Sequence, residues 1–286
     1  ILKLSMLKNL DLPTLLATLS LMVLSTIILN SIAPDIYPSY FIYLILGMLA
    51  YIIFSQIDFD VISLFSKHFF VVSVVLLVVT LVIGSVTRGV VRWIPIGVLS
   101  FQSAEFVRPF LLVFFANRLT DQNLNAKKLF SIILLFLIPL GLILVQPSLG
   151  VALITAVGFV GILLAANIKK RYFLWIVLIT MLSIPLLWTV LAPYQKSRIV
   201  TFLNPASDPL GKGYNSIQSK ISVGSGKLFG RGLGKGVQTQ LSFLPERHTD
   251  FIFASISEEM GLVGGVLVLL GLFVILWRLA IFMERS

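Results

Sequence analysis

Residues 129–168 read LFSIILLFLIPLGLILVQPSLGVALITAVGFVGILLAANI, forty residues without one charged side chain. A helix needs about 20 mostly apolar residues to cross the hydrocarbon core of a bilayer. This stretch is therefore long enough for two membrane spans. Gln146-Pro147-Ser148 lies near its middle and is typical of a turn. The segment predicts two membrane helices joined by a short turn.

The composition of the whole chain agrees with a membrane protein. Of the 286 residues, 58% are hydrophobic and 12% are charged, and the mean hydropathy is +1.02. Soluble domains have roughly 25% charged residues, and one this apolar would expose much of its apolar surface to water. These values exclude a soluble enzyme, a disordered chain and a secreted disulfide scaffold. There is no cysteine, so disulfides and thiolate catalysis are also excluded.

Further apolar stretches bring the expected total to about eight spans, which predicts an all-α polytopic membrane protein. We treat residues 1–286 as one integral-membrane domain. The expected spans are residues 14–33, 40–57, 68–83 and 101–117, two within 129–168, then 172–191 and 250–278. Two connections are unusual: a polar, aromatic loop at 84–100 and a long polar stretch at 192–249.

The positions of Lys and Arg predict how the chain is oriented. The net charge of +10 is assigned to topology and to anionic membrane lipids, not to nucleic acid. With the N-terminus in the cytoplasm, eleven basic residues fall on the inner side, and only Arg88 and Arg92 fall in short outer loops. The inner residues are Lys3, Lys8, Lys67, Arg118, Lys127, Lys128, Lys169, Lys170, Arg171, Arg278 and Arg285. Residues 192–249 then form a large extracellular loop between the seventh and eighth spans.

This outer loop is strongly basic, with eight Lys and Arg residues against Asp208 and Glu246. Such a loop beside a bilayer suits an anionic ligand such as a phosphate or pyrophosphate. The alternative is a solvated loop that meets lipid headgroups. Its glycine-rich part, residues 224–236, could let backbone amides approach a phosphate. It lacks P-loop spacing, however, and a flexible hinge is the other interpretation.

Residues 244–254, LPERHTDFIFA, carry the sharpest chemical signal. Asp250 stands at the mouth of the eighth predicted span, with Arg247 close in sequence. A carboxylate placed there could act as a general base on a hydroxyl. The alternative is structural, since Thr249 or Asp250 could cap the helix that follows. His248 is one of only two histidines and makes no metal site by itself.

Charged residues within predicted spans are expected to be paired or functional. Glu105 and Arg108 are i, i+3 neighbours, which favours a structural pair. Glu258 and Glu259 follow Asp250 at about 12 Å along a helix and could pair with Arg108 or line a polar cavity.

Trp93 in the 84–100 loop is either an interfacial anchor or a platform for a sugar ring.

Several of these motifs together resemble the SEDS (shape, elongation, division and sporulation) family of RodA and FtsW type. The resemblance covers about residues 10–280 with its motifs in the family's order. The residues at Gln238–Gln240 and Pro245–His248 resemble the RodA branch more than the FtsW branch. The motifs are 243–253 with Glu258-Glu259-Met260-Gly261, Asp208–Gly211, Gln218–Lys220, 224–226, 230–232, Gly89–Trp93, Phe101-Gln102 with Glu105, and Gln146–Gly150.

The resemblance implies a peptidoglycan glycosyltransferase of the bacterial plasma (inner) membrane, acting in cell elongation or division. Its substrate would be lipid II, a disaccharide-pentapeptide on undecaprenyl pyrophosphate, polymerised at the outer face. Its partner would be a class B penicillin-binding protein, which crosslinks the strands. A divalent cation, Mg or Mn, is left open as a cofactor, with its ligands unknown.

Individual roles also follow from the resemblance. The family's essential acidic residue maps onto Asp250, which we expect to be the catalytic base. The outer-loop Trp maps onto Trp93, and the acid–base pair of the fourth span maps onto Glu105 and Arg108. We group as candidate substrate-binding residues Trp93, Arg198, Lys220, Lys227, Arg231, Glu246 and His248.

The sequence departs from the family pattern in several respects. The family's Gln-Pro-Ser-Glu appears as Gln102-Ser103-Ala104-Glu105, and its Lys at the next helical turn is Arg108. The family has about ten spans, so we expect a C-terminally truncated chain. Ser148 stands where the family has an aspartate. Two other functions stay open: a lipid II flippase, and a non-catalytic scaffold that activates the penicillin-binding protein.

Overall fold

The computed structural model describes residues 10–87, 90–96, 99–120, 124–166, 168, 170–211 and 213–285. The chain divides into two compact units, Ile57–Leu191 and Ile1–Gln56 together with Ala192–Ser286. We describe each unit by itself. Several basic residues that entered the charge count lie outside the described residues: Lys3, Lys8, Arg88, Lys169 and Lys212.

Helices occupy all eight stretches in which spans were expected. They are α2 (Leu12–Ile32), α3 (Tyr37–Gln56), α5 (Ser66–Ile83), α6 (Ser103–Leu119), α7 (Ala126–Val145), α8 (Leu149–Ala165), α9 (Lys170–Val190) and α13 (Ile252–Arg285). Within the described residues, five are long and apolar enough to cross a membrane: α2, α3, α5, α7 and α13. The chain is thus an all-helical multi-pass membrane protein, while the count of eight spans stays a prediction.

The 129–168 stretch forms the two helices that its sequence predicts. Helix α7 ends at Val145 and α8 begins at Leu149. Between them Gln146 is fully buried, and its side-chain amide donates to the carbonyl of Leu77 on α5 at 3.0 Å. The turn is therefore fixed to a neighbouring helix by a buried hydrogen bond.

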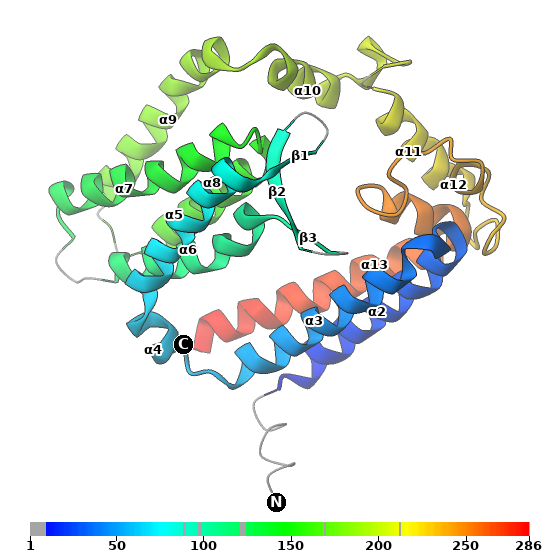
Figure 1. Ribbon diagram of the computed structural model, residues 1–286, viewed down its shortest axis with the longest axis horizontal. Coiled ribbons are helices and arrows are strands. Elements are labelled where there is room, and N and C mark those ends of the chain that lie inside the picture. Colours follow the sequence, from blue (N-terminus) through cyan, green and yellow to red (C-terminus); the bar gives the residue numbers. More distant parts are fainter. Residues whose placement is uncertain are drawn as a thin grey trace, which may run out of the picture. The chain divides into compact units, whose positions relative to one another are not determined.

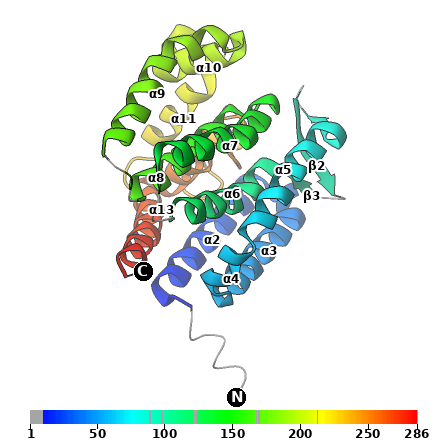
Figure 2. The same cartoon turned by 90° about the vertical axis from the view of Figure 1, so that its left-hand side faces the viewer.

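Helices α5 to α8 pack together in the 57–191 unit (Figure 2). An aromatic cluster fills part of its core. The rings of Phe136 and Phe159 stack with centroids 4.0 Å apart, and Phe115 meets Phe159 edge-on at 5.2 Å. A short helix, α4 (Phe59–Leu64), precedes α5.

The 84–100 connection is more regular than the loop that we expected. It contains three short antiparallel strands, β1 (Ser85–Thr87), β2 (Val90–Ile96) and β3 (Leu99–Phe101), in that order. Its valines and isoleucines favour extended structure. The prediction of a loop rested on polarity and aromatic content alone, and so it missed these strands.

In the other unit, α2, α3 and α13 lie side by side (Figure 1). Leu24, Ile28 and Leu29 of α2 form its core with Ile256 of α13. A short 3-10 helix, η1 (Pro34–Ile36), joins α2 to α3.

An ion pair ties the other ends of α2 and α13 together. The Asp11 carboxylate accepts from the backbone N–H of Thr14 at 3.1 Å and so caps α2. It also pairs with the guanidinium of Arg278. The hydrogen bond from Arg278 lowers the pKa of the Asp11 carboxyl to about 2.

Residues 192–249 are a folded segment with four short helices. These are α10 (Pro193–Leu203), η2 (Pro205–Ser207), α11 (Tyr214–Ser225) and α12 (Val237–Gln240). Helix α11 packs on α13. This part of the chain therefore contains more regular structure than a loop, whatever side of the membrane it faces.

Candidate active site

Helix α13 is broken at Gly261, so the eighth predicted span is not one continuous helix. Gly261 has φ 69° and ψ −159°, which no helix accommodates. A first part, Ile252–Met260, precedes the break, and the apolar part begins at Leu262. A break of this kind leaves backbone N–H and C=O groups that need partners elsewhere.

The glycine-rich segment supplies those partners. We name residues 226–232 the glycine clasp, because they form main-chain hydrogen bonds with both sides of the break. The bonds run from Leu262 N–H to Lys227 O (2.9 Å), Val263 N–H to Leu228 O (3.3 Å), Arg231 N–H to Glu258 O (2.9 Å) and Gly232 N–H to Glu259 O (3.0 Å). The clasp thus satisfies the helix ends on both sides of Gly261.

Glycine is required in the clasp because the two backbones touch. A Cβ on Gly226 would lie 1.8 Å from the carbonyl oxygen of Ser257, and one on Gly230 would lie 2.1 Å from that of Glu259. Gly230 also has φ 80°. The Arg231 and Gly232 amides already donate to α13, so these two are not free to bind a phosphate, and these bonds attach the segment to α13 in a way that a flexible hinge would not require.

Glu258, which precedes the break in α13, holds the short helix α12 in place. Its side chain is fully buried, and its two carboxylate oxygens accept from the backbone N–H groups of Gln238 (2.9 Å) and Thr239 (3.0 Å). These groups belong to the first turn of α12, where a negative charge is favourable. Arg108, the other partner considered for Glu258, pairs with Glu105 on α6 at 2.7 Å.

Glu259 is also buried and connects α13 with α2 through one glutamine. Its Oε1 accepts from the Gln240 side-chain amide at 2.9 Å, and the same amide donates to the Ser31 carbonyl at 3.1 Å. The other oxygen, Oε2, is buried without a hydrogen-bond partner within the described residues. Glu258 and Glu259 therefore organise the segment before Asp250; neither lies within the apolar part of α13.

Asp250 sits in a tight turn immediately before α13. The backbone N–H groups of Thr249 and Phe251 both donate to the Glu246 carbonyl, at 3.1 and 3.2 Å. Glu246 has φ 52°, and its carboxylate accepts from the Thr249 hydroxyl at 3.1 Å. In the described part of the chain, neither the Thr249 hydroxyl nor the Asp250 carboxylate accepts a hydrogen bond from the first turn of α13; only the Thr249 carbonyl does, from the Ile252 N–H at 3.3 Å. The capping alternative for these side chains is therefore not supported.

The Asp250 carboxylate is exposed and has no hydrogen-bond or ion-pair partner among the residues that the structure describes. A carboxylate in this state can accept a proton from a substrate hydroxyl placed against it.

Arg247 anchors this turn to the end of α2. Its Nε and Nη2 atoms donate to the Ile32 carbonyl at 3.3 and 3.2 Å, and its Nη1 donates to the Ser242 hydroxyl at 2.8 Å. The Ser255 hydroxyl donates to the Arg247 carbonyl at 2.9 Å. The guanidinium thus contacts a helix C-terminus, where cations are favourable.

The remaining predicted site residues fall into two groups. Arg198, Lys220, Lys227 and Arg231 are exposed on the 192–249 segment, and His248 is half-buried beside Asp250 in sequence. Trp93 on β2, and Glu105 and Arg108 on α6, belong to the 57–191 unit. The structure therefore gathers Glu246, His248, Asp250, Glu258 and Glu259 in one unit.

No group of three or more Asp, Glu or His side chains that could hold a metal ion occurs among the described residues. The side chains around Asp250 therefore do not by themselves form the divalent-cation site that the sequence left open, and we assign no catalytic step to a metal.

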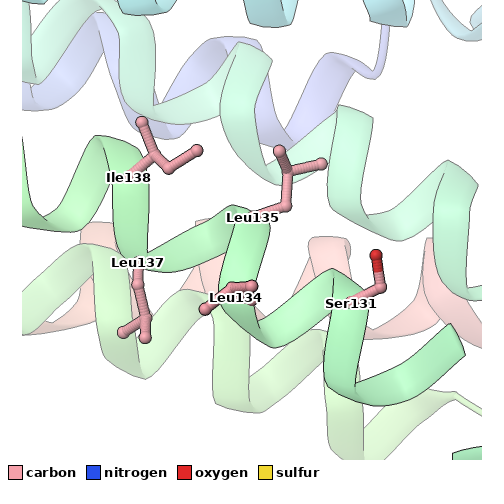
Figure 3. Close-up of a pocket in the computed structure, with 5 residues that line it drawn as sticks. All are labelled: Ser131, Leu134, Leu135, Leu137 and Ile138. Atoms are coloured by element: carbon pink, nitrogen blue, oxygen red, sulfur yellow. The ribbon is translucent and has the colours of Figure 1, made fainter. Parts of the chain in front are cut away.

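Unlike the surroundings of Asp250, a hollow on the surface of α7 is almost entirely apolar. It is lined by one serine and four apolar side chains from that helix alone (Figure 3): Ser131, Leu134, Leu135, Leu137 and Ile138. These side chains include no titratable group, so the hollow suits an apolar neighbour such as a lipid chain and not catalysis.

Comparison with known proteins identifies the family. The sequence profile of FtsW, RodA and SpoVE, described as "Cell cycle protein", matches residues 4–286. The chain belongs to the FtsW/RodA/SpoVE family. The resemblance seen in the sequence motifs is thereby confirmed.

Curated members of this family show substantial identity to the chain. Peptidoglycan glycosyltransferase MrdB of Escherichia coli K12 is 37% identical over 235 residues, which cover 81% of this chain and 63% of MrdB. An FtsW protein of Escherichia coli O6:H1 is 38% identical over 245 residues, which cover 83% of this chain and 58% of that protein. The chain thus spans less than two thirds of their length. The similar identities do not separate the RodA and FtsW branches.

Solved structures of the family share the fold. A chain from a peptidoglycan synthase complex that coordinates polymerization and crosslinking aligns with a TM-score of 0.76 at 27% identity, covering 94% of this chain and 76% of that one. Thermus thermophilus rod shape determining protein RodA aligns with a TM-score of 0.66 at 25% identity, covering 94% of this chain and 73% of that one.

Proposed function

We propose that this chain carries the active site of a peptidoglycan glycosyltransferase that polymerises lipid II at the outer face of the bacterial plasma membrane. Asp250 is the general base. The observation that carries this proposal is the carboxylate of Asp250, which is exposed and has no partner among the described residues. Arg247 and Ser255, on either side of Asp250 in sequence, hold this turn through hydrogen bonds.

The proposed step is a single inverting displacement. The Asp250 carboxylate accepts the proton of the acceptor 4-hydroxyl as that oxygen forms a bond to the anomeric carbon of the donor N-acetylmuramic acid. The bond between that carbon and the pyrophosphate oxygen breaks, and undecaprenyl pyrophosphate leaves with the electron pair.

Exposed cations support departure of the pyrophosphate. Arg198 and Lys220 project from the segment that precedes Asp250, and Lys227 and Arg231 belong to the glycine clasp. Fixed positive charge aimed at a developing anion is usually a large catalytic contribution. We assign substrate contacts to Glu246 and His248 in the Asp250 turn, and sugar stacking to Trp93.

The wider setting belongs to the same proposal. The N-terminus faces the cytoplasm, eight spans are present, residues 192–249 face outward, and the chain is one integral-membrane domain of the RodA branch. A class B penicillin-binding protein is the partner. This is supported by the match to a chain from a synthase complex that couples polymerization to crosslinking.

The test is polymerisation of lipid II by the purified protein with its class B partner. The parent is expected to make glycan strands, and Asp250→Asn to lower the rate about 10²- to 10⁴-fold, the range for loss of a general base. Full activity in Asp250→Asn would remove Asp250 from the mechanism. Movement of labelled lipid II between leaflets without strands would favour a flippase, and partner binding without either would favour a scaffold.

A further inference from the structure

The glycine-rich segment exposes apolar side chains between its cations, which the proposed chemistry does not explain. Residues 209–245 contain five Lys and Arg residues and no Asp or Glu. Within residues 227–235, the cations Lys227, Arg231 and Lys235 are exposed. Three apolar side chains between them are exposed as well: Leu228 (58%), Phe229 (82%) and Leu233 (51%). We name residues 227–235 the basic-apolar tip.

The main-chain hydrogen bonds of the tip fix its depth relative to the membrane. Lys227 and Leu228 pair with the first two residues after the break in α13. From Leu262 to Arg285 that helix is about 36 Å long at 1.5 Å per residue, and it carries no charge before Arg278. The charge-free part, Leu262–Trp277, is about 24 Å long and crosses most of the roughly 30 Å hydrocarbon core, so Leu262 lies near one membrane surface.

A second helix places the tip at the same level. The Gly234 N–H donates to the Ser31 hydroxyl at 2.8 Å, next to the last residue of α2, Ile32. Helix α2 is itself long and apolar enough to cross a membrane. The tip is therefore attached to the ends of two neighbouring membrane helices, both at one membrane surface.

We propose that the basic-apolar tip is a membrane-seating element that binds anionic phospholipid in the leaflet beside it. Leu228, Phe229 and Leu233 enter the boundary between headgroups and acyl chains, and Lys227, Arg231 and Lys235 contact lipid phosphates. Exposed apolar side chains flanked by cations are typical of elements that lie in this interface. The proposal goes beyond the glycosyl transfer proposed above and does not depend on Asp250.

The main-chain hydrogen bonds of the glycine clasp connect lipid binding by the tip to the position of the Asp250 turn. Because the tip is bonded on both sides of Gly261, its contact with lipid fixes the first part of α13 relative to the bilayer. That part carries Glu258, which in turn holds α12. Lipid contact would thus set the height of the Asp250 turn above the membrane.

Site-directed spin labelling tests the proposal directly, because the chain has no cysteine. Phe229→Cys, labelled with a nitroxide, is compared with Leu210→Cys in nanodiscs without added lipid II. Leu210 is 92% exposed but lies in a turn whose main-chain hydrogen bonds stay local. Collision with oxygen relative to a water-soluble nickel chelate is expected to be several-fold higher at position 229.

A charge variant tests the phospholipid. In the labelled Phe229→Cys protein, Lys227→Gln, Arg231→Gln and Lys235→Gln are combined, and phosphatidylcholine nanodiscs are compared with ones that also contain phosphatidylglycerol. With the three cations intact, the label is expected to lie deeper in the membrane when phosphatidylglycerol is present. In the triple variant, its depth is expected to be the same in both lipid mixtures. A thermal unfolding midpoint equal to that of the parent shows that the triple variant is folded. If the midpoint falls, the single Lys235→Gln variant is used in its place.

Other outcomes overturn the proposal. A label at position 229 that is exposed to water in both lipid mixtures would show that the tip does not enter the membrane. Protection that appears only on addition of a polyprenyl pyrophosphate assigns the tip to the substrate. Protection that appears only with the penicillin-binding protein assigns it to a protein interface.

Discussion

The backbone N–H of Thr239 donates to the buried carboxylate of Glu258 at 3.0 Å, so the chain from Thr239 to Glu258 forms a loop closed by one side chain. Asp250 lies inside this loop. Arg247 and Ser255 attach the same loop to α2 and to the first part of α13. The candidate base is exposed, but the residues on both sides of it are fixed to membrane helices.

Glu258→Gln is expected to lower the stability of this unit by about 1.5–3 kcal/mol, the usual size of a hydrogen bond to a charged group. An amide replaces one acceptor oxygen with a donor, so only one of the two α12 N–H groups keeps its partner. Thermal unfolding in detergent measures the change. Glu284→Gln is the matched control, because Glu284 is exposed. Equal midpoints for the two variants would contradict the role given to Glu258.

Gly261→Ala is expected to be strongly destabilising. Its φ of 69° alone costs a non-glycine residue about 1–3 kcal/mol, and the new Cβ would lie 2.3 Å from the Gly230 nitrogen. Gly224→Ala in α11 provides the comparison, since nothing lies within 4 Å of its Cβ position. That change should stabilise the protein by about 0.5–1 kcal/mol. Unfolding midpoints of the two variants should therefore move in opposite directions.

The Asp11–Arg278 pair predicts a dependence of stability on pH. The folded-state pKa of Asp11 is lowered from 3.8 to about 2, so its contribution is present above about pH 4 and is lost as pH falls toward 2. The difference in unfolding midpoint between the parent and Asp11→Asn should be constant from neutral pH to about pH 4 and then shrink. A difference that stays unchanged down to pH 2 would show that the pair does not titrate in this range.

The sequence predicted the helices well because membrane spans depend on long apolar runs, which are local. It also pointed to the Gly-rich segment and to Glu258 and Glu259, but it did not predict the contacts that they make. Their roles depend on contacts between positions far apart in the chain, such as Gly230 with Glu259 and Gly234 with Ser31. The Gly261 break had one local signal, a glycine between Met260 and an apolar run, but glycines are also common within membrane helices.

Arg247 provides a test of whether anchoring the turn matters for catalysis. Arg247→Ala removes the donors to the Ile32 carbonyl and the Ser242 hydroxyl, so the turn is expected to shift and kcat for lipid II polymerisation to fall up to about 10²-fold, as for a misplacement of 1 Å. Ser242→Ala removes one of these contacts and should have a much smaller effect. Because Asp250 remains as the base, the pH profile of the residual activity should match that of the parent. A kcat equal to the parent's in Arg247→Ala would show that this anchor has no part in catalysis, and a changed pH profile would show that Arg247 acts on the base itself.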